Sequence, residues 1–384
     1  MKGQILGNLS KEPFASFSFP VVTLPPGEEE GLKKPDLHQP FIDGLLHTSI
    51  GEVPRVSASL NRNDRWGTIK ARWGVGRMHY TVDPGLYALG TPGEDSPVLV
   101  TASYKMSFDR LRSALPGRDA WILVLNTGGI NVWCASGKGT FGTEELVRRV
   151  EFCEVAKVVR HRRLILPQLS APGTAAHKVT KFSGFKVSYG PIRAEDLPAF
   201  LDNDMTTTPA MRIKTFTFLE RLVLVPVELV EAMKIYLVIL PGLLFLGGLG
   251  GGGGFWVNVT QHGLFAAAAT LGAIIAGAVL TPMLLPWLPG RAFALKGAWM
   301  GLVPAATLVA FRAEWLQTTA GLMELAAWCL LTLAVAAYLG MNFTGASSYT
   351  SLSGVKKEMR WAVPMEIAAA VVGLGLWITS RFIA

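Results

Sequence analysis

The scarcity of charged side chains in the last 151 residues constrains this 384-residue chain more than any other feature. Residues 234–384 contain eight Lys/Arg and four Asp/Glu, whereas residues 1–233 contain 28 and 24. A membrane core is crossed by about 20 mostly apolar helical residues. Five stretches meet this condition, so a membrane part is predicted to follow a soluble part, which excludes a purely soluble enzyme, a disordered chain and a disulfide scaffold. The five stretches are 235–256, 264–288, 297–311, 318–339 and 361–378.

The Lys/Arg content of the short connections predicts the orientation of these spans, because positive connections stay in the cytoplasm. High and low counts alternate along the chain, which places the N-terminus inside and the C-terminus outside. The N-terminus lacks the apolar core of a signal peptide. We therefore expect a multi-pass protein of the inner (cytoplasmic) membrane with its soluble part in the cytoplasm.

Two acidic residues, Glu324 and Glu366, fall inside predicted spans. Ionisable groups there are costly unless they are paired or hydrated, so they are candidates for function. The alternative is that they lie near span ends or bond to Ser and Thr. Gly247–Gly254 either lets helices approach closely or forms a flexible break.

The sequence divides into an extended or disordered lead (1–47), a folded cytoplasmic domain (48–210), a linker or interfacial helix (211–233) and the membrane part (234–384). In the folded domain, short β-rich runs alternate with helical stretches, which predicts an α/β fold with a mainly parallel sheet. Ligands bind such sheets at the carboxyl ends of the strands. The predicted strands are 78–82, 98–104, 121–126, 164–167 and 185–188, and the predicted helices are 105–115, 144–160, 174–181 and 194–202.

Three cysteines, Cys134, Cys153 and Cys329, are too few and too far apart for a disulfide framework, a zinc finger or an intrinsic iron–sulfur cluster. Cys153 and Cys329 fall on predicted helices and are expected to be small buried hydrophobes. Cys134 differs because it lies in a glycine-rich stretch, 127–143, directly after a predicted strand. We predict a loop there and look for chemistry in it.

Known phosphate-binding patterns do not fit this loop. A P-loop needs Ser or Thr after Gly137-Lys138, but Gly139 follows, and its first glycine position holds Val132. The spacing Gly137-x-Gly139-x-x-Gly142 matches a dinucleotide fingerprint, but it begins about ten residues after the strand and lacks an acidic ribose partner.

Three roles for Cys134 stay open on the residues alone. A nucleophilic cysteine would need a base such as His161 or His177, which nothing in the sequence places nearby. A buried structural cysteine is the second possibility. The third is a soft-metal ligand, since Lys138 and a helix N-terminus would both favour the thiolate.

The stretch from residue 131 to residue 138 resembles the signature N-[VI]-W-C-A-[AS]-G-K of the mercury-methylating membrane corrinoid proteins, the HgcA family. All eight positions match: Asn131, Val132, Trp133, Cys134, Ala135, Ser136, Gly137 and Lys138. Residues 64–90 and 342–360 are also similar to that family, as is the five-span tail. The resemblance covers about 48–384.

This resemblance implies a Rossmann-like corrinoid-binding domain over 48–210, related to that of the corrinoid iron–sulfur protein of the acetyl-CoA pathway. The signature would form a cap helix over the corrin, with the Cys134 thiolate as the lower axial ligand of base-off cobalt. The other seven signature residues would form the cap. The implied reaction is transfer of methyl from methyl-Co(III) corrinoid to Hg(II). An axial thiolate would push electron density toward the methyl, as it does in haem enzymes.

The family also implies partners: a ferredoxin-like protein with two [4Fe–4S] clusters, which is the electron donor and a candidate mercury carrier, and a methyl-tetrahydrofolate-type donor. The histidine-ligating corrinoid motif Asp-x-His-x-x-Gly begins at Asp36 and His38 but fails at Phe41. Without a dense basic tract, no nucleic-acid partner is expected. Two alternative functions remain: a membrane-anchored corrinoid methyl carrier of one-carbon metabolism, and a membrane transporter or sensor that uses Glu324 and Glu366.

Overall fold

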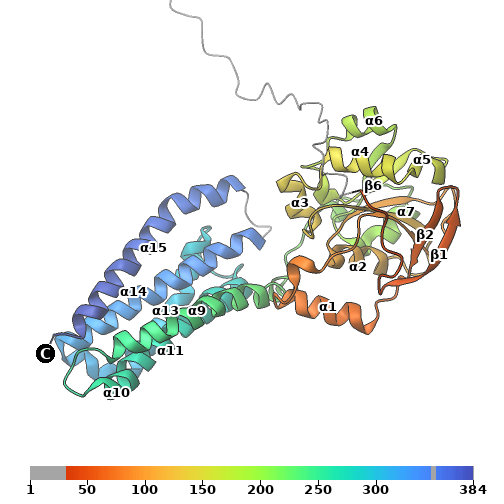
Figure 1. Cartoon of the computed structure of the whole chain (residues 1–384). Helices are drawn as coiled ribbons and strands as arrows, with labels where there is room; N and C mark the ends of the chain where they lie inside the picture. The colour runs from red at the N-terminus through yellow and green to blue at the C-terminus, as the bar shows by residue number, and fades with distance from the viewer. Residues whose placement is uncertain (1–31, 347–351, 384) are drawn as a thin grey trace, which may run out of the picture.

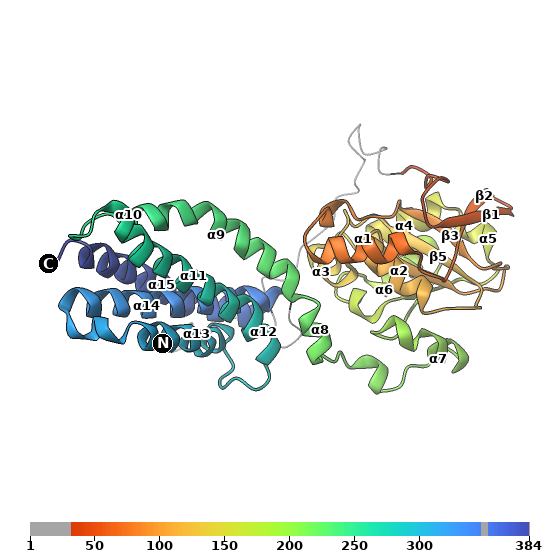
Figure 2. The ribbon, with the colours of Figure 1, turned by 90° about the horizontal axis from the view of Figure 1, so that it is seen from below.

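A computed structural model describes residues 32–346 and 352–383. It consists of an N-terminal α/β part and a C-terminal bundle of long helices, joined near residue 220 (Figures 1 and 2). The predicted fold class, a mainly parallel α/β domain followed by five helices that could cross a membrane, is confirmed.

Seven strands form one sheet in the order β1-β2-β3-β5-β4-β6-β7. Strands β5, β4, β6 and β7 are mutually parallel, and β2 is parallel to β3, whereas the β1–β2 and β3–β5 pairs are antiparallel. The strands are β1 (Ile42–Thr48), β2 (Gly51–Val56), β3 (Gly85–Leu89), β4 (Val98–Ala102), β5 (Ala120–Leu125), β6 (Arg163–Leu166) and β7 (Lys186–Tyr189).

Helices cover both faces of the sheet, because alternate side chains of the buried strands enter two apolar clusters. One cluster includes residues of α4 (Thr143–Phe152), α5 (Val155–Val158) and α6 (Ala176–Ser183). The other includes residues of α2 (Lys105–Ser113) and α7 (Leu197–Asp202). Since β3, β4 and β5 are buried throughout, their sequences are continuously apolar.

Four of the five predicted strands are confirmed as β4 to β7, but the strand at 78–82 is wrong. That segment contains a short 3₁₀ turn, Arg77–His79, and Thr81 makes only an isolated bridge to Tyr104. The predicted helix 144–160 is two helices, because the chain turns at Glu154 with a φ of 46°.

The unstructured lead predicted up to residue 47 is corrected, because β1 starts at Ile42 and pairs with β2. Residues 1–31 lie outside the described residues. The sequence predicted neither β1, β2 nor β3. Strand β1 lies at the sheet edge with only alternate residues partly covered, so its apolar pattern is weak.

Helix α1 (Arg62–Arg72), also unpredicted, is anchored by a buried network of charges. Asp64 accepts from Lys105 Nζ and from Arg112 Nη2, each at 2.7 Å. Asp109 accepts from Lys105 Nζ at 2.6 Å and from Arg112 Nε at 2.8 Å. All four side chains are at most 6% exposed, so the network joins α1 to α2 without solvent.

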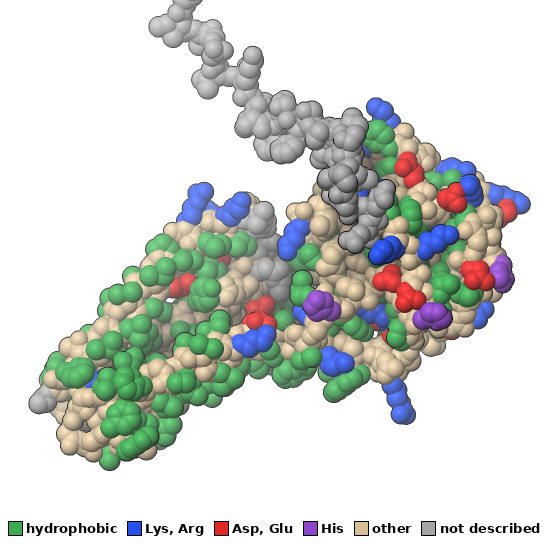
Figure 3. Space-filling view, in the orientation of Figure 1, with side chains coloured by type: hydrophobic (Ala, Val, Ile, Leu, Met, Phe, Trp, Pro, Cys, Tyr) green, Lys and Arg blue, Asp and Glu red, His purple; other side chains and the backbone are tan. Residues whose placement is uncertain are grey.

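The C-terminal part contains five segments that are long and apolar enough to cross a membrane, each a single helix or a series of consecutive helices. Hydrophobic side chains cover most of the visible surface of the bundle, whereas charges gather on the α/β part (Figure 3). The elements are α9 (Val225–Gly248), α10 (Phe255–Asn258), α11 (Leu264–Ile274), α12 (Thr281–Leu284), α13 (Phe293–Phe311), α14 (Thr319–Asn342) and α15 (Leu352–Ser380).

The first span differs from its prediction at both ends. Helix α9 begins at Val225, earlier than the predicted span, and the short helix α8 (Phe218–Leu222) lies within the predicted linker 211–233. It ends at Gly248, and the following glycines form a loop rather than the end of the span. A Cβ on Gly247 would lie 2.4 Å from Gly263 Cα, so glycine here permits the close helix approach that was expected.

We predict that Arg112→Gln destabilises the α/β part by about 3–5 kcal/mol, the usual cost of breaking a buried ion network. Urea-dependent proteolysis of the detergent-purified chain measures this cost. Asp202→Asn is the control, because its pair with Arg118 is largely exposed and its loss should change stability far less. Equal effects of the two substitutions would contradict a structural role for the network.

The same network predicts acid sensitivity. Burial by itself would raise the pKa of Asp64, but bonds from Lys105, the Asn61 backbone and Arg112 outweigh it and hold that pKa below its ordinary 3.8. A depressed pKa contributes stability that is complete above the ordinary value and is lost as pH falls through the folded-state value. Below about pH 4, the unfolding midpoint of the wild type should therefore decrease more steeply with falling pH than the midpoint of Asp64→Asn.

Candidate functional site

Helix α3 (Val132–Lys138) lies at the carboxyl ends of the central strands. The chain leaves β4 through α2 to β5 on one side, then returns through α3, α4 and α5 to β6 on the other side of β4. Helix α3 contacts both β4 and the 3₁₀ turn that follows β6, Gln168–Ser170. It therefore lies over the β4–β6 boundary, the topological switch point where parallel α/β sheets bind ligands.

The loop predicted over 127–143 is wrong for residues 132–138, which are helical as the family resemblance implied. Asn131 begins the helix as its N-cap: its Oδ1 accepts a hydrogen bond of 2.9 Å from the Cys134 backbone N–H. Gly139, with a φ of 84°, ends it. A short helix between two glycine-rich turns leaves little periodicity for a sequence pattern to detect.

The two faces of α3 have different surroundings. Ala135 and Ser136 are buried, and Val132 packs partly against the core. Trp133, Gly137 and Lys138 are exposed and Cys134 is half-buried, so these four residues occupy the opposite face. All eight residues of the predicted site thus lie on one short element, with Cys134 on its open side.

Two contacts fix the height of α3 above the sheet. Ser136 Oγ donates a buried hydrogen bond of 3.1 Å to the Ser170 carbonyl. A Cβ on Gly173 would lie 2.5 Å from the Phe141 carbonyl oxygen and 2.7 Å from Ser136 Oγ, so only glycine fits there. The turn that carries Ser170 and Gly173 therefore acts as the seat of α3.

The turn between β5 and α3 is also held by buried bonds. Ser103 Oγ, just after β4, accepts from the Thr127 backbone N–H at 3.1 Å. Thr127 Oγ1 donates to the Ile130 carbonyl at 2.7 Å. Glu145 of α4 accepts from the Asn126 backbone N–H at 2.8 Å and from Arg149. The turn that leads to Cys134 is thus hydrogen-bonded both to the residue that follows β4 and to α4.

The segment after α1 supplies a second wall of this edge, to which the sequence assigned no role. The Tyr80 carbonyl accepts from the Lys105 backbone N–H at 3.0 Å, next to β4. A Cβ on Gly129 would lie 3.0 Å from the Met78 carbonyl, so this segment also touches the turn before α3. Met78, Trp73 and Val75 expose 63%, 49% and 61% of their surface. The sequence signal that could have identified this segment is the run of aromatic and apolar residues spaced by glycines within 64–90.

Of the two histidines considered as bases, His161 is held away from the site by a hydrogen bond. His161 Nε2 bonds to the Ser96 carbonyl at 2.9 Å, and Ser96 precedes β4, so this histidine lies at the amino ends of the strands. His177 is exposed on α6. Among residues 32–346 and 352–383, no group of three His, Cys, Asp or Glu side chains could hold a metal ion.

The open face of this edge is turned toward the membrane-type bundle. In both ribbon views, α3 lies on the side of the α/β part that is nearest to the bundle (Figures 1 and 2). Arg72 at the end of α1 donates a hydrogen bond of 3.2 Å from Nη1 to the Val223 carbonyl, just before α9. A Cβ on Gly74 would meet Val230 of α9 at 3.7 Å.

These features define a class: an α/β domain with an open carboxyl edge and a half-buried cysteine on it, attached to a bundle of apolar helices. The family model "CO dehydrogenase/acetyl-CoA synthase delta subunit" matches residues 75–201, which include β3 to β7 and all of α3. The match ends before the bundle and covers about a third of the chain.

The chain is also similar to gamma subunits of acetyl-CoA decarbonylase/synthase complexes. The subunit from Methanopyrus kandleri is 33% identical over 125 residues, which cover 32% of this chain and 27% of that subunit. The subunit from Archaeoglobus fulgidus is 31% identical over 168 residues, which cover 42% and 35%. The chain thus spans about a third of the length of these curated relatives.

We predict that maleimide labels Cys134 before Cys153. Burial raises the pKa of Cys153 to about 11, so its reactive thiolate is scarce near pH 7.5. Cys134 is half-buried on an open face. Mass spectrometry after a short pulse reads the two sites separately, and labelling in urea shows whether Cys153 reacts once exposed. Faster labelling of Cys153 in the folded protein would contradict this assignment.

We also predict that Gly173→Ala displaces α3 and costs about 1–3 kcal/mol, as overpacking does. Gly137→Ala is the matched control, because its Cβ would meet no described atom within 4 Å. Urea-dependent proteolysis measures stability, and maleimide labelling of Cys134 reports displacement of the helix. If both variants behave like the wild type, the turn at Ser170–Gly173 is not the seat of α3.

Proposed function

We propose that this chain is a membrane-anchored, corrinoid-dependent methyltransferase that transfers a methyl group to Hg(II). The observation that carries the proposal is the placement of the eight-residue stretch 131–138: a helix over the switch point, with Cys134 on its open face. The similarity of the chain to acetyl-CoA decarbonylase/synthase gamma subunits supports a corrinoid methyl-transfer component.

The residues at this edge fit a flat macrocycle. Positions 137 and 128 are glycines at which an added Cβ would meet no described atom within 4 Å, so the backbone is open to a ligand there. Trp133 offers an exposed apolar surface on the same face, and Lys138 offers a charge for polar groups at the ring periphery. Cys134 supplies one soft ligand, which is what cobalt already held in a macrocycle requires.

In the proposed site, Cys134 is both the catalytic residue and the metal ligand, and Asn131 to Lys138 bind the cofactor. When bound, the corrinoid would supply the methyl group that is transferred, and Cys134 would hold its metal. Asn131 orients Cys134 by accepting its backbone N–H. Ser136 holds α3 at its distance from the sheet through the hydrogen bond to the Ser170 carbonyl. The partly buried hydrogen bonds of Thr127 and Glu145 hold the preceding turn in place.

The membrane arrangement in this proposal follows the charge of the connections: the α/β part lies in the cytoplasm and the C-terminus outside. Three dispersed cysteines cannot hold an iron–sulfur cluster, so reducing electrons have to come from a partner. We propose a ferredoxin-like protein with two [4Fe–4S] clusters for this role and a methyl-tetrahydrofolate-type system as methyl donor. Hg(II) is the substrate.

A second candidate function keeps the corrinoid and changes the acceptor. The gamma-subunit relatives belong to acetyl-CoA decarbonylase/synthase complexes. That similarity favours a membrane-anchored methyl carrier of one-carbon metabolism. Methyl transfer to a metabolic acceptor without transfer to Hg(II) would select this function over mercury methylation.

We predict that anaerobic cobalamin binding to the detergent-purified full chain gives the UV–visible and EPR signature of a base-off, thiolate-ligated cobalt. Cys134→Ala should lose that signature because it removes the ligand, while Cys134→His should give a nitrogen-ligated one. Cys153→Ala is the matched control and should retain the wild-type spectrum. Cobalamin binding with an unchanged spectrum in Cys134→Ala would refute thiolate ligation.

We further predict that Cys134→Ala lowers mercury methylation more than about a hundredfold in cells lacking other copies, since even outer-shell changes at metal sites cost 10–100-fold. Methylmercury formed per cell is the measurement. Full activity in Cys134→Ala would overturn the proposed function.

A further inference from the structure

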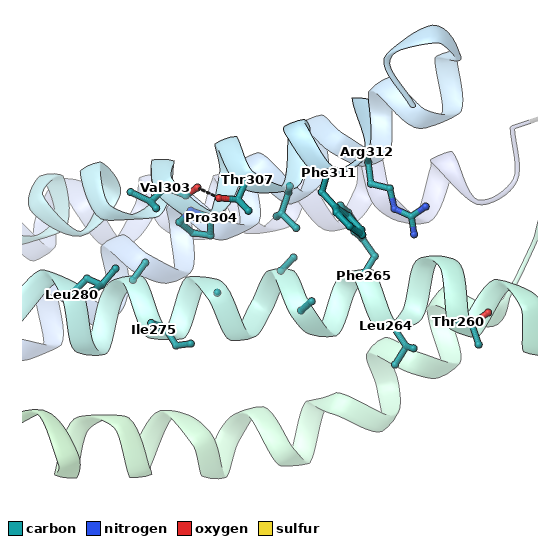
Figure 4. A pocket seen from close by; sticks show the side chains of 15 residues that line it. Thr260, Leu264, Phe265, Ile275, Leu280, Val303, Pro304, Thr307, Phe311 and Arg312 are labelled. Carbon is teal, nitrogen blue, oxygen red and sulfur yellow. Dashed lines mark hydrogen bonds between the residues drawn. The ribbon is translucent and has the colours of Figure 1, made fainter. Parts of the chain in front are cut away.

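A groove runs along the bundle between the second span and α13, far from the site at Cys134. It encloses about 610 Å³ and extends from Thr260 and Arg312 at one end to Leu280 and Val303 at the other. Figure 4 shows Arg312 and Phe265 at the end of the groove distant from Leu280. In Figures 1 and 2 the same end of the bundle, near α10, points away from the α/β part.

Two departures from regular helix coincide with this groove. The second span contains π-helical segments at Val259–Gly263 and Ile275–Leu280, and the groove is lined by residues of both. Such segments are rare and are frequent at functional sites. On the facing helix, Pro304 lines the groove, and a Cβ on Gly272 would lie 3.1 Å from its ring. The groove is therefore shaped by backbone irregularities on both helices.

The lining is apolar along its length and polar at one end. The hydroxyls of Thr260 and Thr307 donate to the Val257 and Val303 carbonyls of their own helices, at 2.7 and 2.9 Å, so they offer no donor to a ligand. Figure 4 shows the second of these bonds. Arg312 is the one charged residue of the lining, and its side chain is 22% exposed.

Arg312 has bonding capacity left. Its Nη2 donates to the Gln261 carbonyl at 3.1 Å and its guanidinium lies over the Trp315 ring at 4.6 Å. Glu314, its acidic neighbour, is 3.7 Å away and 61% exposed, beyond hydrogen-bond distance. The buried Nε has no hydrogen-bond partner among the described residues. An arginine in this state is suited to a phosphate oxygen.

We propose that this groove binds one phospholipid of the leaflet distant from the α/β part, with an acyl chain along α11 and α13 and its phosphate on Arg312. An apolar channel with a single cationic end matches the chemistry of that occupant along its whole length. The surrounding helices are long and apolar enough to lie in a membrane, so phospholipid is the available ligand. This binding site is independent of the methyl-transfer proposal.

Native mass spectrometry of the detergent-purified full chain tests the site with two probes that share their acyl chains, a phosphatidylglycerol and a diacylglycerol. We expect one tightly held phosphatidylglycerol and about tenfold weaker binding of diacylglycerol, the effect of losing one charge-assisted hydrogen bond. Arg312→Gln should reduce phosphatidylglycerol binding to the diacylglycerol level. Arg291→Gln, which removes an exposed charge outside the groove, should leave it unchanged.

A second pair of variants tests the acyl-chain channel. Ala268→Phe fills the lining and should weaken both probes, whereas Ala306→Phe places the same ring on an exposed position of α13 outside the lining and should weaken neither. Thermal unfolding confirms that each variant is folded. Equal binding of the two probes, an unaffected Arg312→Gln, or equal losses in the two phenylalanine variants would overturn the proposal, because each is the behaviour of non-specific lipid around the bundle.

Discussion

The packing of one face of α3 onto the ends of β4 and β6 is the constraint on which the arrangement of this protein depends. Ala135 is fully buried and Ser136 is bonded to Ser170, so neither position can grow without lifting the helix. The eight-residue stretch thereby divides into two kinds of residue. Capping and packing of the helix explain four of the residues: Asn131, Val132, Ala135 and Ser136. The packing of the helix does not require the other four, because Trp133, Gly137 and Lys138 are exposed and Cys134 is half-buried.

The sequence predicted the parts of the fold whose patterns are local. Short β-rich runs marked β4 to β7, and the five membrane-type helices were evident from length and lack of charge. It failed where pairing or capping decides structure. Strand β1 needs its partner β2 to bury alternate residues, and α1 depends on a capping box and on charges from α2. Cys134 was found from its glycine-rich setting, but the seat at Ser170–Gly173 carries no local signal, because it is defined by residues about 35 positions away.

The acidic residues inside the bundle have different surroundings. Glu324 accepts from Trp377 Nε1 at 3.3 Å and lies 2.7 Å from His262 Nδ1 and 3.7 Å from Arg381 Nη1. Glu324 thus connects α14 with the start of the second span and with the end of α15, at the end of the bundle distant from the α/β part. Both carboxylate oxygens of Glu366 are buried without a hydrogen-bond partner among the described residues. The glycine loop after α9 packs onto the C-terminal end, where the Gly251 N–H bonds to the Arg381 carbonyl at 3.0 Å.

The contact between Arg72 and Val223 has a consequence for how reactants meet this molecule. It joins the segment beside the candidate site to the start of α9, so that the open edge is held next to the bundle instead of turning freely on a tether. A bilayer around the bundle would close off half of the directions from which a dissolved macromolecule could arrive, and such orientational restriction slows association. A partner confined to the same surface searches two dimensions and meets the edge at a raised effective concentration. The geometry therefore favours delivery along the membrane surface over capture from bulk solution.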